Sequence, residues 1–145
     1  MTAFLLDVNV LIALMWPAHE SHSQVREWFA RHARQGWATC PLTQAAFVRL
    51  VSNPAFSRDA VTPREAIALL TANLKHRHHR FWGDEIGLGE AVEPLQGRLV
   101  GHRQVSDAYL LGLAIHKKGK LATLDQALLA LLPPDSPHRD RVEII

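Results

Sequence analysis

Three aspartates, far apart in the sequence, each stand beside a segment with the composition of a buried strand or a helix start. Asp7 directly follows the apolar run 4–6 and precedes a second apolar run. Asp125 comes one residue after the apolar segment 121–123, and Asp107 stands in the first turn of the predicted helix before that segment. A charge among apolar residues is costly to desolvate. We therefore expect Asp7 to cap a helix, to pair with a base or to bind a metal.

If the strands are parallel, the three carboxylates meet at one edge of the sheet, because sites in such sheets form at the carboxyl ends of the strands. Converging carboxylates repel, so one of them holds a proton or a divalent cation lies between them. No histidine adjoins any of the three. Oxygen ligands alone favour Mg²⁺ or Mn²⁺ over zinc. Such an ion activates water and neutralises phosphate oxygens, which is the chemistry of phosphodiester hydrolysis.

Each aspartate also has a purely structural interpretation. Asp107 can serve as an acid near a helix N-terminus, where it interacts favourably with the helix dipole. Asp125 can cap a helix. Asp7 is harder to explain in this way, because apolar residues flank it on both sides. All three structural interpretations holding together is less plausible than any one of them.

Short apolar strands alternate with amphipathic helices, a pattern that predicts an α/β domain with a mostly parallel central sheet. We expect strands at 4–6, 37–40, 121–123 and 142–145, an extended piece at 79–88, and helices at 9–15, 20–34, 42–52, 62–75, 105–118 and 125–132. The chain has 145 residues and contains no repeat and no linker, so we expect a single domain over 1–145.

Composition excludes several classes of protein. Apolar residues make up 48% of the chain, which argues against disorder. The single cysteine, Cys40, excludes an internal disulfide and favours a cytoplasmic setting. We expect no signal peptide and no membrane span, because no apolar run approaches about 20 residues. No glycine-rich phosphate loop occurs, which argues against an NTPase.

The charge is mild but unevenly distributed. The formal net charge of +2 permits a nucleic-acid partner without requiring one. Basic residues concentrate in the segment KHRHHR at 75–80. This segment lacks the His-x-x-x-His spacing of a zinc site, so we interpret it as a solvated basic loop that can touch RNA phosphates.

Four segments resemble the PIN-domain ribonucleases, and in particular the VapC-type toxins of bacterial toxin–antitoxin systems. They are LLDVNVLIAL, TCPLTQAAFVRLVSNP, GHRQVSDAYLLGLA and LATLDQAL, which together span nearly the whole chain. The resemblance implies a three-layer α/β/α fold, an acidic Mg²⁺ site and cleavage of RNA by metal-activated water. It also implies a homodimer and inhibition by a small VapB-type antitoxin whose C-terminal segment blocks the site.

The resemblance also assigns roles to the acids. The family's first acid corresponds to Asp7, with Asn9 completing the Asp-x-Asn arrangement. The later acids correspond to Asp107 and Asp125. We expect Asp7 and Asp107 to bind Mg²⁺, directly or through waters, and Asp125 to complete the acidic pocket.

One acid of the family pattern is missing. The family has a glutamate in the helix after the second strand, where this chain has Gln44 or Ala46. Gln44 can offer a neutral carbonyl oxygen, and Asp84 is the candidate replacement, with Glu85 second. We expect one firm metal position and a second that is filled only when RNA brings its own phosphate oxygens.

Four further residues are candidates to support the site. Thr123 matches a position where the family has a small hydroxyl residue, and it can orient a water. Arg49 can pair with a site carboxylate or contact phosphate. His102 and Arg103 stand just before the site helix and can reach RNA.

Together these observations predict a Mg²⁺-dependent endoribonuclease that acts as a toxin. A phosphatase or DNA nuclease could use the same acids. The non-enzymatic alternative is a degenerate PIN-like module that binds RNA or a protein without cutting, which the missing glutamate favours.

Overall fold

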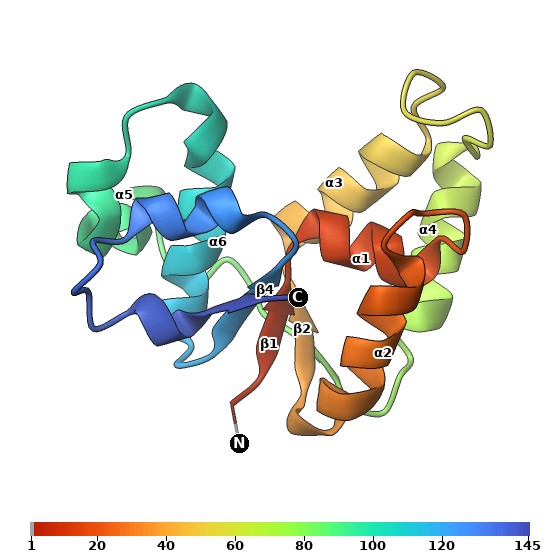
Figure 1. Cartoon of the computed structure of the whole chain (residues 1–145). Helices are drawn as coiled ribbons and strands as arrows, with labels where there is room; N and C mark the ends of the chain where they lie inside the picture. The colour runs from red at the N-terminus through yellow and green to blue at the C-terminus, as the bar shows by residue number, and fades with distance from the viewer. Residues whose placement is uncertain (1) are drawn as a thin grey trace.

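The computed structural model describes residues 2–145, and its centre is a sheet of five parallel strands (Figure 1). The strands are β1 (Phe4–Leu6), β2 (Trp37–Thr39), β3 (His79–Phe81), β4 (Lys120–Thr123) and β5 (Val142–Ile144). Their spatial order is β3-β2-β1-β4-β5, and each neighbouring pair runs parallel. The carboxyl ends of all five strands therefore lie at the same edge, as the sequence predicted.

The remaining elements are helical. The α-helices are α1 (Val8–Met15), α2 (His22–His32), α3 (Pro41–Val51), α4 (Pro63–Asn73), α5 (Leu88–Val92) and α6 (Val105–His116). Short 3₁₀ helices are η1 (Ala33–Gln35), η2 (Glu93–Arg98), η3 (His102–Gln104), η4 (Gln126–Leu131) and η5 (Arg139–Arg141). None of the helices in the described part of the chain is long and apolar enough to cross a membrane.

Two cores, one on each face of the sheet, give the fold its three layers. Successive strand residues point to opposite faces, so Leu5 joins the core shared with α5 and α6, whereas Phe4 and Leu6 join the core shared with α1 to α4. Figure 1 shows α5 and α6 on one side of the sheet and α1, α2, α3 and α4 on the other. The predicted α/β/α architecture is confirmed.

A glycine allows α6 to pack closely against α5. A Cβ added to Gly112 of α6 would collide with the backbone carbonyl of Ala91 in α5. Because that neighbour is backbone rather than a flexible side chain, it cannot move aside cheaply. Gly112 therefore lets α6 pack directly against α5, which fixes the position of the helix that carries Asp107.

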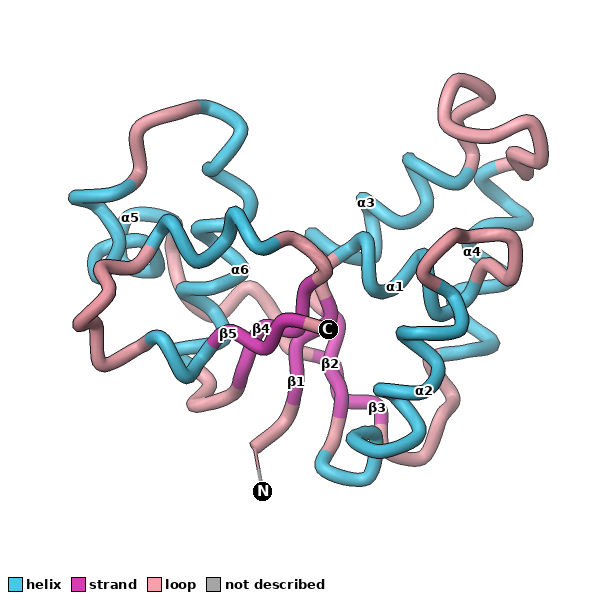
Figure 2. The backbone as a smooth tube through the Cα atoms, viewed as in Figure 1, coloured by secondary structure: helices cyan, strands magenta, loops and turns pink. Residues whose placement is uncertain are grey.

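Most predicted elements match the observed ones to within a few residues at their ends (Figure 2). The segment 125–132 is an exception, because it forms the 3₁₀ helix η4 and not an α-helix. Leu132 precedes Pro133 and adopts an extended conformation with φ −121° and ψ 135°, as a residue before proline prefers. The segment 79–88 contains the strand β3 and ends at the start of α5, a helix the sequence analysis did not predict.

Candidate functional site

Asp7 is the first residue after β1 and is 4% exposed. It is the N-cap of α1, and its Oδ1 accepts a hydrogen bond of 2.8 Å from the backbone N–H of Val8. Its Oδ2 accepts a hydrogen bond of 2.8 Å from the hydroxyl of Thr123. Burial raises the pKa of Asp7, the two hydrogen bonds oppose this rise, and the charge of Asp125 adds to it. The carboxylate is held in place, yet each oxygen keeps a lone pair that can bind a cation.

Thr123 links two of the aspartates. Its hydroxyl donates to Asp7 and accepts a hydrogen bond of 3.0 Å from the backbone N–H of Asp125. A hydroxyl has one proton to donate, and here that proton goes to Asp7. Thr123 therefore positions Asp7, and its role in orienting a water stays a prediction.

Asp107 lies in the first turn of α6, as predicted, and is half-buried. Burial raises the pKa of its carboxyl to about 6, and the charges of Asp7 and Asp125 contribute to the rise. Three acids from both ends of the chain therefore act on one another, as the parallel-sheet rule predicted. None of the described side chains forms an ion pair with Asp107.

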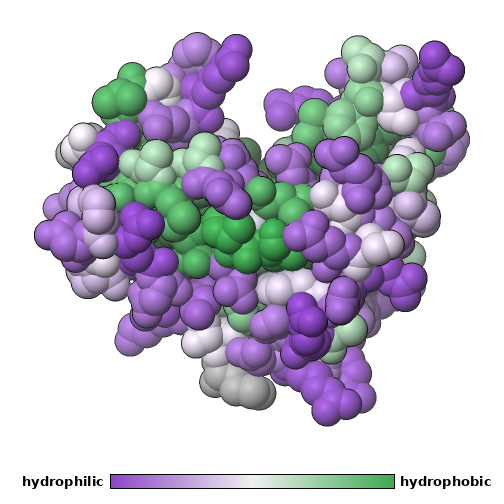
Figure 3. Space-filling model, viewed as in Figure 1, coloured by the Kyte–Doolittle hydropathy of each residue, from purple (hydrophilic) through white to green (hydrophobic). Residues whose placement is uncertain are grey.

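Asp7 and Asp107 face the same cleft, which has a volume of about 170 Å³. The starts of α1 and α6 and one face of α3 form its walls. The other lining residues are Val8, Leu42, Thr43, Ala46, Arg49, Leu50, Ser106 and Leu110. Figure 3 shows a notch at the top of the molecule between the lobe of α5 and α6 and the lobe of α3 and α4.

Arg49 is the one cationic side chain in the lining of this cleft as described. We expected it to pair with a site carboxylate or to contact phosphate, and the contact with phosphate stays a prediction. It forms no ion pair within 4.0 Å with a described carboxylate, so Asp7 and Asp107 are not neutralised by it. The guanidinium is left available to an anion entering the cleft.

Asp125 lies in an adjoining hollow together with Asn9, Glu20 and Gln24. Its Oδ1 accepts a hydrogen bond of 2.9 Å from the backbone N–H of Ala127, so it caps η4. Its side chain lines this hollow and not the cleft of Asp7 and Asp107, while its charge raises the pKa of both. That Asp125 completes the acidic pocket stays a prediction. Asn9 is exposed and lies with Asp125 in this hollow.

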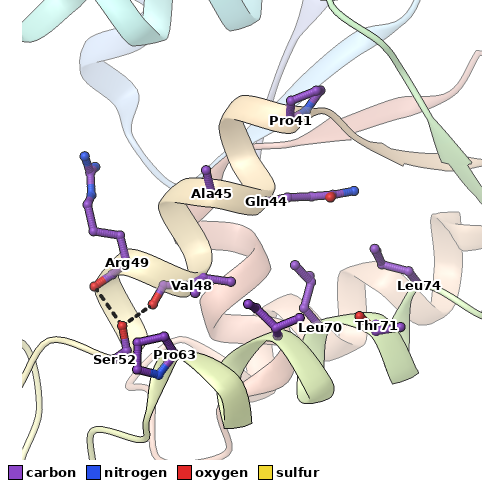
Figure 4. A pocket seen from close by; sticks show the side chains of 11 residues that line it. Pro41, Gln44, Ala45, Val48, Arg49, Ser52, Pro63, Leu70, Thr71 and Leu74 are labelled. Atoms are coloured by element: carbon purple, nitrogen blue, oxygen red, sulfur yellow. Dashed lines mark hydrogen bonds between the residues drawn. The ribbon is translucent and has the colours of Figure 1, made fainter.

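Gln44 does not face the cleft, so the expectation that it offers a carbonyl oxygen there is wrong. Its Nε2 donates a hydrogen bond of 2.9 Å to the hydroxyl of Thr39. Figure 4 shows Gln44 and Arg49 extending from α3 in opposite directions. Ala46, the other candidate for the position of the missing glutamate, lines the cleft and offers only a methyl group.

Asp84 and Glu85 do not replace the missing acid either. Asp84 accepts a hydrogen bond of 3.4 Å from the Tyr109 hydroxyl, and Glu85 accepts one of 2.9 Å from Lys117 Nζ. Both residues follow β3, two strands away from β1, which is a lateral displacement of roughly 10 Å. Neither lines the cleft.

The predicted RNA-contacting residues lie beside the site rather than in it. His102 and Arg103 are exposed in η3, immediately before α6, and their contact with RNA stays a prediction. Two hydroxyl residues of the cleft, Ser106 and Thr43, were not among the predicted site residues. The position of Ser106 directly before Asp107 was the signal that could have identified it.

The cleft fits a hard divalent cation that keeps several waters as ligands better than it fits a metal whose ligands all come from the protein. In residues 2–145, no three His, Cys, Asp or Glu side chains lie close enough to form a ligand set by themselves. Mg²⁺ is commonly bound by one or two carboxylates, several waters and substrate phosphates. Two carboxylates that face one cleft, one of them with a pKa of about 6, match that ligand set.

A second, larger groove lies between α3 and α4 (Figure 4). It has a volume of about 680 Å³ and is lined mainly by apolar side chains, including Val48, Ile67, Leu70 and Leu74. Arg49 lines both this groove and the acidic cleft. The two hollows are therefore neighbours, on either side of Arg49.

The chain is similar to known proteins in sequence and in fold. The family model of the PIN domain matches residues 4–132. Ribonuclease VapC38 of Mycobacterium tuberculosis is 44% identical over 127 residues, which cover 88% of each protein. Ribonuclease VapC39 of the same species is 41% identical over 145 residues, the full length of both.

Two solved structures share the fold at low sequence identity. VapBC2 of Rickettsia felis, crystallised with a DNA fragment from its promoter, aligns with a TM-score of 0.65 at 14% identity, covering 99% of this chain and 98% of that one. FitAcB of Neisseria gonorrhoeae aligns with a TM-score of 0.63 at 15% identity, covering 98% and 96%. At these identities the likeness concerns the fold alone.

Proposed function

The chain belongs to the PIN-domain family and, within it, to the VapC ribonucleases, and from this membership we propose that it is an endoribonuclease acting as the toxin of a type II toxin–antitoxin system. The observation that carries the proposal is the shared cleft of Asp7 and Asp107 at the carboxyl edge of the sheet. Ribonucleases of this family depend in general on a divalent metal.

We propose Mg²⁺ as the ion, with Mn²⁺ as a substitute, held by Asp7 and Asp107 directly or through waters. When bound, an ion of this class withdraws charge from a phosphate oxygen and lowers the pKa of a bound water. The raised pKa of Asp107, about 6, means that its carboxyl sheds its proton just below neutral pH and then favours a cation in the cleft.

The chain's own residues orient the site. Thr123 and the first N–H of α1 hold the Asp7 carboxylate from two sides. Arg49, on the opposite wall of the cleft, is positioned to bind a non-bridging phosphate oxygen of the RNA. Because water attacks phosphorus, the reaction requires no 2′-hydroxyl nucleophile.

A second ion has fewer ligands available. Ala46 offers no oxygen from its side chain, and Asp125 uses one carboxylate oxygen to cap η4. We propose that a second ion is present only when RNA supplies phosphate oxygens to it.

A VapB-type antitoxin, an RNA substrate, a homodimer and a cytoplasmic location complete the proposal. The apolar groove between α3 and α4 supports an antitoxin, because it is open beside the cleft and offers apolar side chains to a partner. A partner seated in this groove would reach the cleft at Arg49, which lines both hollows.

The alternative function is a degenerate PIN-like module that binds RNA or a protein without cleaving RNA. The observation that favours it is Ala46, which leaves the cleft without the family's additional carboxylate. Cleavage by the purified wild-type protein would exclude this alternative.

The test compares Asp7→Asn with the matched control Asp135→Asn, which removes the same charge from an exposed loop residue. RNA and DNA of the same sequence are incubated with each protein and Mg²⁺, and circular dichroism checks the fold. We expect Asp7→Asn to abolish RNA cleavage and Asp135→Asn to retain it. Full activity of a folded Asp7→Asn protein would reject the site, and cleavage of DNA alone would reject the substrate.

A further inference from the structure

A basic hollow lies at the end of the sheet opposite to the acidic cleft. All strands are parallel, so the turns that precede β2 and β3 meet at the edge away from Asp7 (Figure 2). Side chains from α2 form the floor of a hollow of about 590 Å³, and Arg34, Arg77 and His78 stand around it. Figure 3 shows hydrophilic residues gathered at this lower end of the molecule.

Positive charge in this hollow is not compensated by the chain. Arg34 and Arg77 are exposed and form no ion pair with the described carboxylates. The lining contains no acidic residue as far as the structure describes it. Partial desolvation lowers the pKa of His78, and the positive charges of Arg77, Arg34 and Arg80 lower it further. Several cationic groups therefore act on one point, where an anion would be stabilised.

The loop that carries this charge is anchored by one imidazole ring. His76 Nδ1 accepts hydrogen bonds of 3.1 Å from the indole N–H of Trp37 and from the backbone N–H of His78. Since Nδ1 is an acceptor, the ring proton lies on Nε2. The ring also contacts the edges of Phe29 and Trp37, with centroids 5.4 and 5.7 Å apart. The Nε2–H of the ring is a hydrogen-bond donor, which suits an anion in the hollow.

We propose that this hollow binds backbone phosphates of RNA away from the bond that is cut, so that the protein holds a longer RNA than the cleft alone can take. The inference rests on the proposed ribonuclease function. Guanidinium and imidazole N–H groups are suited to phosphate oxygens, and the apolar floor can face ribose or base. Strands of three or four residues separate the two edges by roughly 10–13 Å, so only an RNA of several nucleotides reaches both.

RNA is favoured over an acidic protein segment because the opposite edge of the same sheet carries the site proposed to cut RNA. The chain has a net charge of only +2. The positive and negative charges of the rest of the chain therefore nearly cancel, whereas the arginines of the hollow have no acidic neighbours in its lining.

The test measures RNA binding by the double variant Arg34→Gln/Arg77→Gln. The control is Lys118→Gln, which removes positive charge from an exposed residue in the turn before β4, at the same end of the sheet. Binding of labelled RNAs of about 2 and about 20 nucleotides is followed by fluorescence anisotropy in EDTA, which prevents cleavage, at several salt concentrations.

We expect the double variant to bind the long RNA about 10-fold more weakly and to lose about 1.4 from the slope of log affinity against log salt, about 0.7 per lost phosphate contact. Binding of the short RNA and all binding by Lys118→Gln stay near wild type. Unchanged long-RNA affinity and slope would overturn the proposal and leave an acidic protein segment as the occupant of the hollow.

Cleavage of the same RNAs in Mg²⁺ distinguishes a failure of the proposed ribonuclease function from a failure of RNA binding by the hollow. If the wild-type protein cuts neither RNA, the proposed function fails, whereas the binding data still decide whether the hollow contacts RNA. If the double variant cuts the short RNA normally and the long RNA with a reduced kcat/KM, both the ribonuclease function and RNA binding by the hollow are supported.

Discussion

Neutralising Asp107 should make the protein more stable at neutral pH while removing its activity. Burial, followed by the charges of Asp7 and Asp125, raises the pKa of this carboxyl from 3.8 to about 6. A raised pKa means that the folded chain tolerates the ionised carboxylate poorly. The amide of Asp107→Asn has nearly the same shape and does not ionise, so the variant avoids this cost.

The size of the effect follows from the pKa. The rise of the Asp107 pKa from 3.8 to about 6 corresponds to about 3 kcal/mol at about 1.4 kcal/mol per unit. Because the side chain is only half-buried, solvent screens the charges, and we expect about 1–2 kcal/mol. The folded chain keeps the proton of Asp107 to a higher pH than the unfolded chain does, so wild-type stability falls as pH rises from about 4 to about 6.

The assay is urea and thermal unfolding of the two proteins in EDTA at about pH 7.5 and about pH 4, followed by circular dichroism. At neutral pH we expect the thermal midpoint of Asp107→Asn to lie about 2–8 °C above wild type, and at acidic pH we expect the difference to vanish. Adding Mg²⁺ at about ten times its Kd should then stabilise wild type by about 1.4 kcal/mol and leave the variant unchanged. Asp135→Asn serves as the exposed control.

One result would contradict the prediction for Asp107→Asn. If Asp107→Asn were no more stable than wild type at neutral pH, the carboxylate would not be strained by burial and by its acidic neighbours. The idea that burial and the charges of Asp7 and Asp125 destabilise ionised Asp107 would then be refuted.

Three further predictions use other features of the site and fold. Thr123→Val removes a hydrogen bond worth about 1.5–3 kcal/mol to the ionised Asp7, so the pKa of Asp7 rises further and the acidic limb of the pH–rate profile should move to higher pH. Ala46→Glu restores the missing carboxylate of the cleft, so activity at limiting Mg²⁺ should rise; a fall would contradict the proposed second-ion deficit. Gly112→Ala drives a methyl group into the carbonyl of Ala91, so urea unfolding should show a loss of about 2 kcal/mol, and unchanged stability would mean that α5 and α6 can separate freely.

The fold was largely predictable because its strands are short apolar runs and its helices carry apolar stripes. Strands buried on both faces, such as β1 and β4, give continuous apolar segments, and the starts of α1 and α6 followed from the residues around them. The 3₁₀ helix η4 was misassigned because six residues before a proline can carry the same apolar pattern as an α-helix. Helix α5 has only five residues, too few for a periodic pattern to emerge.

The site was predictable to the level of strand ends and not to the level of side-chain direction. The parallel-sheet rule brought Asp7 and Asp107 together without any knowledge of contacts. The rotation of α3 was not available from sequence, and residues two apart on a helix point about 200° apart. That rotation decides that Ala46 faces the cleft and Gln44 the groove. The spacing of Leu42, Ala46 and Arg49, at intervals of four and three, was the signal that could have revealed it.

Every role proposed for the cleft depends on Asp7 and Asp107 holding a divalent cation together. The most direct measurement is a crystal structure grown with Mn²⁺, in which anomalous scattering locates the ion independently of the protein. We predict an anomalous peak in the cleft within coordination distance, about 2.2 Å, of at least one carboxylate oxygen of this pair and within water-bridged reach of the other. A cleft without a peak at saturating Mn²⁺, or an ion bound elsewhere while RNA is still cleaved, would contradict the account.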